Sequence, residues 1–429
     1  MAMNQTIIEQ VLLDQQDELS ALRNEVLVSR PQESLINLKS KLAQVVIGVR
    51  RSGKSTLCFN ALEKAGVKYA YVNFDDERLD TLQTEDLDKV LESLYRIYGK
   101  FEYLFLDEIQ NIEGWPLFVN RLLRQRLHLI ITGSNAKLLS SELATHLTGR
   151  HHVIELFPFS FKEWCDARSV EYGRLTTQNK GLLANAFDEY LRIGGFPELI
   201  YGEEARPYIN SLFNNIITQD IQHRFNVRNI DELKRMANHI LNESPDCFKL
   251  DDLMELCGIK SDHTVVKYLS YLKQTYLISS VSRYSNKSRM RTRNEKYYAI
   301  DVAFMDKREN AFARENLGWR LETIVYLELR RRYPSDQYDI YYVSDKSGET
   351  DFVVCEGSRT LGVYQVSYDI SGDKTRKREI RGALLGSKTT GCDNIYLITN
   401  QERESIEVKD KKINVVPAYE WLLNFRGDI

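Results

Sequence analysis

Nine residues near the N-terminus have the types and the spacing of a site for nucleotide phosphates. Residues 48–56 read Gly-Val-Arg-Arg-Ser-Gly-Lys-Ser-Thr and match G-x-x-x-x-G-K-[ST] at every fixed position. Glycines let the backbone turn so tightly that successive N–H groups point at one phosphate pair, and the following helix N-terminus adds partial positive charge. Lys54 is expected to reach the β- and γ-phosphates of ATP, and the Ser55 hydroxyl to bind Mg²⁺. The predicted ATP contacts here are Gly48, Arg50, Arg51, Ser52, Gly53, Lys54, Ser55 and Thr56.

Two acids end a second apolar strand about 55 residues further along the chain. A carboxylate at this point is expected to bind Mg²⁺, directly or through water, and Asp107 is the candidate. Glu108 is the candidate for the group that orients or deprotonates the attacking water. Polarity at a strand end is the alternative explanation, but the phosphate motif upstream favours the catalytic one.

Three more residues are candidates for contact with the γ-phosphate or with its developing charge. Ser134 and Asn135 follow the next apolar strand, at the end that lies beside the γ-phosphate in sheets of this type. Their alternative role is to cap a helix expected over 136–143. Arg150 is a candidate for stabilising transition-state charge, either in its own chain or in a neighbouring subunit. The alternative for Arg150 is a surface salt bridge.

A cluster of cations occupies residues 283–296, in the loop between two expected strands. It contains six Lys or Arg residues and one acid, Glu295. Such a cluster suits contact with nucleic-acid phosphates. Charge runs are also common on ordinary solvated surfaces, and several acids over 251–262 weaken the DNA interpretation. The candidate phosphate contacts are Arg283, Lys287, Arg289, Arg291, Arg293 and Lys296.

The elements around the phosphate motif alternate short apolar strands with helical stretches as far as residue 157. Strands that are apolar throughout and separated by helices indicate a parallel sheet covered on both faces. An amphipathic helix over 7–28 precedes them. The expected strands are Gln44–Val49, Tyr69–Phe74, Tyr103–Leu106, Leu127–Thr132 and His152–Leu156.

Beyond Pro158 the pattern of expected elements changes twice. Helices come first, with one sharp break at Gly-Gly-Phe-Pro over 194–197. Three helices and a strand pair follow, the layout of a winged helix, with a helix-turn-helix centred on Gly258. The predicted domains are 1–158, N-terminal helix and P-loop ATPase core; 159–230, helical lid or linker; 231–311, winged helix; and 312–429, an α/β domain.

Composition narrows the class of protein. The 429 residues are 43% hydrophobic and 28% charged, the balance of a folded chain too long for one ordinary core. The net charge of −3 means that any surface for nucleic acid is a local patch. Six scattered cysteines without a C-x-x-C pair argue against a zinc ribbon and a disulfide framework. With no membrane-length apolar run and no signal peptide, we expect a cytoplasmic protein.

Six segments together resemble one known family. They are Gly48–Thr56, Val72–Arg78, Phe105–Ile112, Ile131–Asn135, Leu147–Arg150 and Leu156–Phe161. In this order they resemble the prokaryotic AAA-type P-loop ATPases whose C-terminal half is a domain of unknown function. The resemblance spans nearly the whole chain and implies ATPase activity with ATP and Mg²⁺ as cofactors. It implies no substrate.

The block from residue 312 resembles the restriction-endonuclease fold of PD-(D/E)XK type, with one departure. Glu322 on the leading helix and Asp351 on a strand fit the metal-binding acids of that fold. Its third strand should carry Glu/Asp-x-Lys, whereas this chain has Gln365 and Ser367. Lys374 or Lys377 on the next helix would have to reach back to replace the lysine. We therefore expect a degenerate domain that binds without cutting and keeps a weak metal site at Glu322, Asp351 and Gln365.

The sequence thus predicts an α/β protein: a P-loop parallel sheet with a helical lid, then winged-helix and restriction-endonuclease-like domains. The leading hypothesis is an ATPase coupled to nucleic-acid engagement. One alternative is an ATP-gated, metal-dependent DNA nuclease, and the other is an ATPase switch whose C-terminal half is a protein-interaction scaffold. Expected partners are nucleic acid, DNA before RNA, and a second copy of the chain, with no membrane contact.

Overall fold

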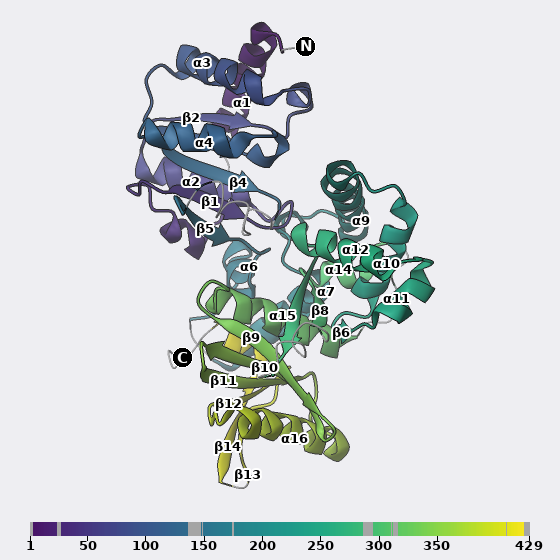
Figure 1. Cartoon of the computed structure of the whole chain (residues 1–429). Coiled ribbons are helices and arrows are strands. Elements are labelled where there is room, and N and C mark those ends of the chain that lie inside the picture. The colour runs from purple at the N-terminus through teal and green to yellow at the C-terminus, as the bar shows by residue number, and fades with distance from the viewer. Residues whose placement is uncertain are drawn as a thin grey trace. The chain divides into compact units, whose positions relative to one another are not determined.

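The structure is a computed structural model, and it describes residues 3–23, 27–135, 147, 149–173, 176–285, 295–309, 311, 316–408 and 410–423. The chain folds into two compact units (Figure 1). The first comprises Met1–Leu156 with Gln274–Tyr276, and the second comprises Phe157–Lys273 with Leu277–Ile429. The boundary predicted near 158 lies beside the division between the units, whereas those predicted near 231 and 311 lie inside the second unit. No helix in the described part of the chain is long and apolar enough to cross a membrane.

A five-stranded parallel sheet forms the centre of the first unit, in the order β2-β3-β4-β1-β5. All five residues of β1 are buried, as expected for a parallel strand with both faces covered. The apolar face of α2 packs on this sheet together with Leu19 of α1. The strands are β1 (Ala43–Ile47), β2 (Tyr69–Asn73), β3 (Tyr103–Asp107), β4 (His128–Gly133) and β5 (His151–Glu155). The helices are α1 (Gln5–Leu22), α2 (Lys54–Ala65), α3 (Leu87–Tyr98) and α4 (Trp115–Arg124), with 3₁₀ turns η1 (Pro31–Leu35), η2 (Glu77–Leu79), η3 (Thr84–Asp86) and η4 (Ile109–Asn111).

Helices open the second unit, with the predicted break at Gly194-Gly195. A Cβ atom on Gly195 would lie 2.2 Å from the carbonyl oxygen of Phe159, so only glycine allows this approach. The Gly195 N–H donates to the buried carboxylate of Asp301 at 2.8 Å, which ties the break to a segment about 100 residues away. The helices are α6 (Phe161–Ala167), α7 (Thr177–Ile193), α8 (Pro197–Ile200) and α9 (Ala205–Asn215), followed by the π-helix η6 (Ile216–His223).

A mixed nine-stranded sheet is the main feature of the second unit, in the order β13-β14-β12-β11-β10-β9-β7-β8-β6. The strands β7 and β9 pair in parallel, with Ser282 opposite Tyr341 and Arg283 opposite Tyr342. One sheet therefore runs across the boundary predicted near 311, and the regions 231–311 and 312–429 are parts of the same unit. The elements before that boundary are α10 (Ile230–Asn242), β6 (Asp246–Cys247), α11 (Leu250–Cys257), α12 (Asp262–Gln274), β7 (Ile278–Arg283), β8 (Glu295–Ala299) and α14 (Ala303–Asp306).

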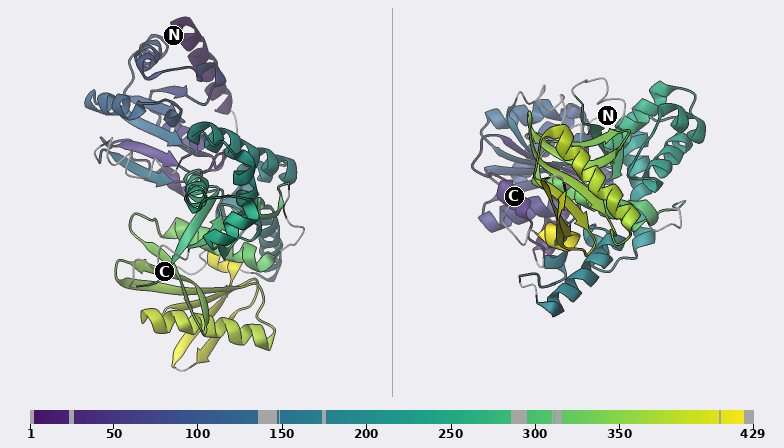
Figure 2. Two further views of the ribbon diagram at one scale, coloured as in Figure 1. Left: turned by 45° about the vertical axis from the view of Figure 1, so that its right-hand side comes forward. Right: turned by 90° about the horizontal axis from the view of Figure 1, so that it is seen from below.

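Within residues 316–408 and 410–423, the chain supplies six strands and three helices of this unit. Helix α16 lies along the sheet and contacts β10, β11 and β12 (Figure 2). An apolar core between them contains Val353, Val363, Ala383, Leu397 and Val415. The elements are α15 (Leu317–Arg332), β9 (Asp339–Asp345), β10 (Gly348–Glu356), β11 (Arg359–Ser367), α16 (Asp373–Thr390), β12 (Ile395–Thr399), β13 (Glu404–Val408), β14 (Lys411–Pro417) and α17 (Ala418–Leu423).

Candidate functional site

The predicted phosphate loop connects the carboxyl end of β1 to the start of α2. Gly48 has φ +157°, and a Cβ atom there would lie 2.0 Å from the carbonyl oxygen of Leu156, so no larger residue fits. Gly53 has φ +87° and caps α2, whose first residue is Lys54. The loop therefore has the tight backbone and the helix N-terminus that a phosphate site requires.

Asp107 and the Ser55 hydroxyl lie together, as the two motifs predict. The Ser55 Oγ donates to Asp107 Oδ1 at 2.9 Å, and Tyr71 and Thr132 also donate to this carboxylate. Burial, together with the nearby charge of Glu108, raises the pKa of Asp107 to about 6. A hydroxyl and a carboxylate in contact, both oxygen donors, suit Mg²⁺.

Glu108 lies one residue further, in a strained left-handed conformation with φ +51°. Its Oε1 lies 3.4 Å from the Lys54 ammonium, and its Oε2 accepts from the Ser134 N–H at 3.0 Å and from Gln110. Burial alone would raise the pKa of Glu108, but the Lys54 charge and these hydrogen bonds hold it at about 2. The carboxylate is thus ionised and fixed beside the phosphate loop.

Further contacts support this site, and one of them comes from a residue that the sequence did not single out. The Arg30 guanidinium is buried and donates to the Ser52 carbonyl at 2.8 Å, so a residue before the sheet braces the phosphate loop. Arg50 forms an ion pair with Asp75 at 2.8 Å. That pair holds one acid after β2 against the phosphate loop, and a neighbouring acid, Asp76, caps η2.

The remaining predicted residues of this site divide between the two ends of the sheet. Asn135 is buried and follows β4, whose Gly133 carbonyl accepts from the Gly48 N–H, so it lies at the end that carries the phosphate loop. Residues 136–143, where the capped helix was expected, lie outside the described residues. Arg150 precedes β5, and its carbonyl accepts from the N–H of Ala43 at the start of β1. A five-residue strand, about 16 Å long, therefore separates it from the phosphate loop of its own chain, and of the two roles left open for Arg150 the one in a neighbouring subunit fits this placement.

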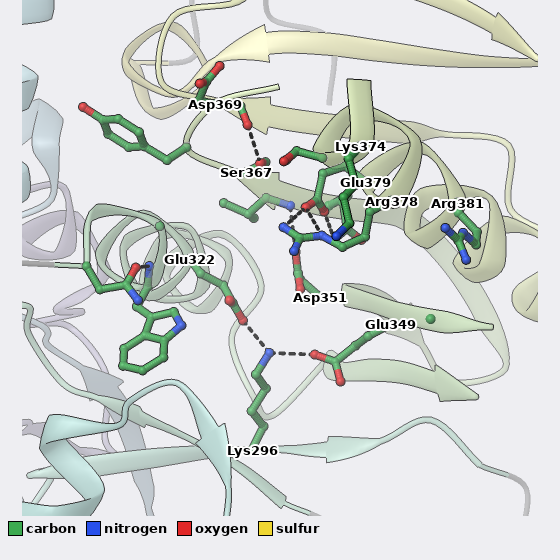
Figure 3. Close-up of a pocket in the computed structure, with 18 of the residues that line it drawn as sticks. Lys296, Glu322, Glu349, Asp351, Ser367, Asp369, Lys374, Arg378, Glu379 and Arg381 are labelled. Atoms are coloured by element: carbon green, nitrogen blue, oxygen red, sulfur yellow. Dashed lines mark hydrogen bonds and ion pairs between the residues drawn. The ribbon is translucent and has the colours of Figure 1, made fainter. Parts of the chain in front are cut away.

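A second group of charged residues lies in the second unit, around a cavity of about 950 Å³ (Figure 3). Lys296 of β8 reaches into this cavity, with its ammonium 2.8 Å from Glu322 on α15 and 2.8 Å from Glu349 on β10. Tyr298 donates to the same Glu322 oxygen at 2.8 Å. Burial alone would lower the pKa of Lys296, but the carboxylates, that of Glu322 most of all, raise it well above the ordinary value. The cavity therefore holds a firmly protonated lysine.

The acids predicted to bind metal in this region are brought together but already have partners. Asp351 lies where the β9–β10 pairing shifts register, and it accepts from the Val366 N–H at 2.8 Å. Burial and the charge of Glu322 raise the pKa of Asp351 well above its ordinary value. Gln365 donates to Glu379 at 2.8 Å. Within the described ranges no group of three or more His, Cys, Asp or Glu is placed to hold a metal ion.

The cation cluster predicted to bind nucleic acid must be corrected at its two described members. Lys296 points into the acidic cavity and is only 7% exposed, so it is not available to phosphates on the hairpin surface. Arg283 donates to the Ser344 carbonyl within the sheet. The other four residues, Lys287, Arg289, Arg291 and Arg293, lie outside the described residues.

The sheet, the loop between β1 and α2, and the Ser55–Asp107 contact define a P-loop nucleotide-binding domain of AAA type. Residues 40–165 match the family described as "AAA domain", and residues 184–313 match "Domain of unknown function (DUF8612)". Two relatives align almost end to end. The uncharacterized protein MJ1544 of Methanocaldococcus jannaschii is 31% identical, covering 98% of this chain and 96% of the relative. An uncharacterized protein of Haemophilus influenzae is 30% identical, and the alignment covers 91% of this chain and 97% of the relative.

This chain, with its AAA domain followed by DUF8612, belongs to the same family as these archaeal and bacterial proteins. Among solved structures, it is similar to AMPPCP-bound DnaA from Aquifex aeolicus at 16% identity and a TM-score of 0.26, covering 56% of this chain and 85% of that one. It is also similar to the RuvB Holliday junction branch migration motor of Thermotoga maritima at 16% identity and a TM-score of 0.26, covering 64% and 93%. Scores this low carry no further argument.

Proposed function

We propose that this protein is an ATPase that binds and hydrolyses Mg-ATP at the phosphate loop of its first unit. The observation that carries the proposal is the pairing of the two motifs, Ser55 with Asp107 at 2.9 Å and Lys54 with Glu108 at 3.4 Å. Each pair places a phosphate- or metal-binding group of the loop beside an acid at the end of β3. This is the arrangement that phosphoryl transfer to water requires.

The residues present fit both ATP and Mg²⁺. Only glycine fits at position 48, and without a side chain there the loop backbone is free to surround phosphates. The Ser55 hydroxyl and the Asp107 carboxylate, both oxygen donors, meet where Mg²⁺ would bind. Mg²⁺ would neutralise charge on the phosphates. Lys54 would bind the β- and γ-phosphate oxygens, and the ionised Glu108 would orient the attacking water and accept its proton.

Phosphate release from ATP by the purified full chain is the direct test. Lys54→Ala should abolish binding of a fluorescent ATP analogue and with it hydrolysis, since the loop loses the cation expected to bind the β- and γ-phosphates. Lys68→Ala is the matched control, because Lys68 is exposed and precedes β2 at the opposite end of the sheet. Hydrolysis that persists at the parent rate in Lys54→Ala would contradict the proposal.

The raised pKa of Asp107 predicts how ATP binding depends on pH. A protonated Asp107 does not bind Mg²⁺, so the gain in ATP affinity from Mg²⁺ should be largest above pH 6 and should shrink as the pH falls through about 6. Titrations with a fluorescent ATP analogue, with and without Mg²⁺, measure this gain at each pH. Asp107→Asn should lose the gain at every pH; a gain in wild type that is constant down to pH 5 would contradict the assignment of Asp107.

We propose in addition that the second unit engages nucleic acid. The order α10, β6, α11, α12, β7, β8, with β8 between β6 and β7 in the sheet, supports a winged-helix arrangement. His263 and Lys267 lie exposed on the first turns of α12, the surface such a helix presents to a major groove. The order α15, β9, β10, β11, α16, β12 supports a restriction-endonuclease-like arrangement after it. A protein-interaction scaffold is the alternative use of the same surfaces.

The arginines of the hairpin give the clearest test of that proposal. Replacing Arg289, Arg291 and Arg293 with Ala should weaken binding to duplexes of unrelated sequence. It should also flatten the slope of log K against log salt by about 0.9 for each lost phosphate contact. Fluorescence anisotropy over a salt series measures the slope, and an unchanged slope would favour the scaffold.

We also propose that the protein self-associates, because of the position of Arg150. Because it lies at the opposite end of the sheet from its own phosphate loop, it can reach transition-state charge only in the site of a second copy.

A further inference from the structure

The acids of the second unit's cavity need a positive charge between them. Five acids line this cavity, and three of them act on Lys296: Glu322 from α15, and Glu349 and Asp351 from β10. Carboxylates this close repel one another unless a cation or a proton intervenes. In a nuclease-like arrangement of strands, that cation would be a divalent metal ion.

In this protein a side chain supplies the cation. The Lys296 ammonium lies 2.8 Å from a carboxylate oxygen on each of the two elements, so it bridges α15 and β10 as a metal ion would. Figure 3 shows Lys296 between Glu322 and Glu349. The Asp351 carboxyl accepts a backbone N–H instead, and its raised pKa favours the uncharged form. The Lys296 ammonium therefore already supplies the positive charge that these carboxylates need, and no metal ion is required to supply it.

The mouth of the same cavity carries a row of cations. Lys374, Arg378 and Arg381 line it from α16, at spacings of four and three residues that place them on one face of the helix. All three are exposed, and the row extends over about 10 Å of the helix. Lys377 and Lys388 lie exposed on the same helix but do not line the cavity. Cations in a row at the mouth of a cavity suit a chain of phosphates.

We propose that this cavity binds the phosphodiester backbone of a nucleic-acid strand without a divalent cation, with Lys296 in the place of the metal ion. Lys374 and Arg381 contact phosphates at the mouth, and Lys296 neutralises the acids that would otherwise repel the strand. The cavity binds without cutting, because Gln365 brings no charge and the Ser367 hydroxyl donates to the Asp369 carbonyl at 3.1 Å. The inference rests on the proposal that the second unit engages nucleic acid.

The first test measures binding of a fluorescein-labelled single-stranded oligodeoxynucleotide to the full chain, without nucleotide, in EDTA and in Mg²⁺. Wild type should bind at least as tightly in EDTA as in Mg²⁺, because it needs no metal ion and Mg²⁺ competes with the side-chain cations for phosphates. Lys374→Ala/Arg381→Ala should bind more weakly, and its slope of log K against log salt should fall by about 1.4, which is 0.7 for each single-strand contact. Lys377→Ala/Lys388→Ala makes the same change in charge on the same helix and should keep the parent slope.

Three outcomes would overturn the inference: binding that requires Mg²⁺ or Mn²⁺, cutting of the strand in either metal, or the same loss in both double variants. Because ATP is absent, none of these bears on the ATPase proposal. If the hairpin arginine variant loses binding while the α16 variants do not, the second unit engages nucleic acid but not through this cavity.

The second test asks whether Lys296 replaces a metal ion. Mn²⁺ binding, followed by its electron paramagnetic resonance signal without nucleotide, should be the same in wild type and Glu322→Gln. Lys296→Met should bind one more Mn²⁺ per chain, and Lys296→Met/Glu322→Gln should lose it again. Wild type that loses a bound Mn²⁺ on Glu322→Gln, or a folded Lys296→Met that gains none, would contradict the replacement. If Lys296→Met does not fold, the wild-type comparison still decides.

Discussion

Glu108→Gln should leave ATP bound while lowering its hydrolysis by about 10²- to 10⁴-fold, the usual contribution of a positioned general base. Gln keeps the size of the side chain and an oxygen that can accept from the Ser134 N–H, but it cannot accept a proton from water. The uncharged amide also frees the Lys54 ammonium for phosphate, so affinity for ATP should be equal to or higher than in wild type. Equilibrium binding of a fluorescent ATP analogue and single-turnover phosphate release measure the two quantities separately.

Glu102→Gln is the matched control for this variant. Glu102 is an exposed acid that precedes the same strand β3, at the end of the sheet away from the phosphate loop. It should hydrolyse ATP at the parent rate. If Glu108→Gln hydrolyses ATP as fast as this control, another group activates the water and Glu108 only holds Lys54.

The phosphate loop could be predicted from the sequence because its determinants are local. Gly48 and Gly53 both have positive φ angles in one tight turn of the backbone, a conformation that favours glycine. Lys54 and Ser55 follow them directly in the sequence. The five strands of the first unit were also predicted to within about two residues at each end, since a strand buried on both faces is apolar throughout. The two motifs also predicted that Ser55 and Asp107 share one Mg²⁺ site, and the two side chains are in contact.

Contacts between distant segments could not be predicted in the same way. Arg30 reaches Ser52 across 22 residues, and no local pattern distinguishes it from other arginines of the chain. The pairing of β7 with β9 joins two regions that differ in pattern, so the sequence suggested two domains where one sheet exists. For Arg150 the sequence left open whether it acts in its own chain or in a neighbour, and its position before β5, at the end of the parallel sheet away from the phosphate loop, favours the neighbour.

Lys296 was misassigned because it follows a run of cations, although the sequence did carry the relevant signal. In the strand Glu295–Ala299, Lys296 and Tyr298 lie two residues apart and therefore on one face. A lysine that shares a face with a tyrosine, in a strand of apolar neighbours, is expected to point inward toward an acid. Both side chains do contact the same oxygen of Glu322.

Lys296→Met should destabilise the second unit by about 3–5 kcal/mol at neutral pH, the usual cost of removing one partner of a buried ion pair. The lysine side chain is 8% exposed and that of Glu322 is 12% exposed, so neither charge is well solvated in the folded protein. Methionine fills much of the space of the lysine stem, so the loss measures charge more than packing. Urea unfolding followed by tryptophan fluorescence reports on this region, because Trp319 lines the cavity.

Adding Glu322→Gln to Lys296→Met should restore most of the lost stability, because the uncompensated carboxylate is then gone while an oxygen remains to accept from Tyr298. Adding Glu349→Gln instead should restore less, since the Glu349 side chain is 40% exposed and water already solvates its charge. The two double variants make the same change in charge at the two ends of one bridge. Equal recovery in both would mean that Lys296 contributes through net charge alone, and the buried bridge to Glu322 would then not be what holds α15 against the sheet.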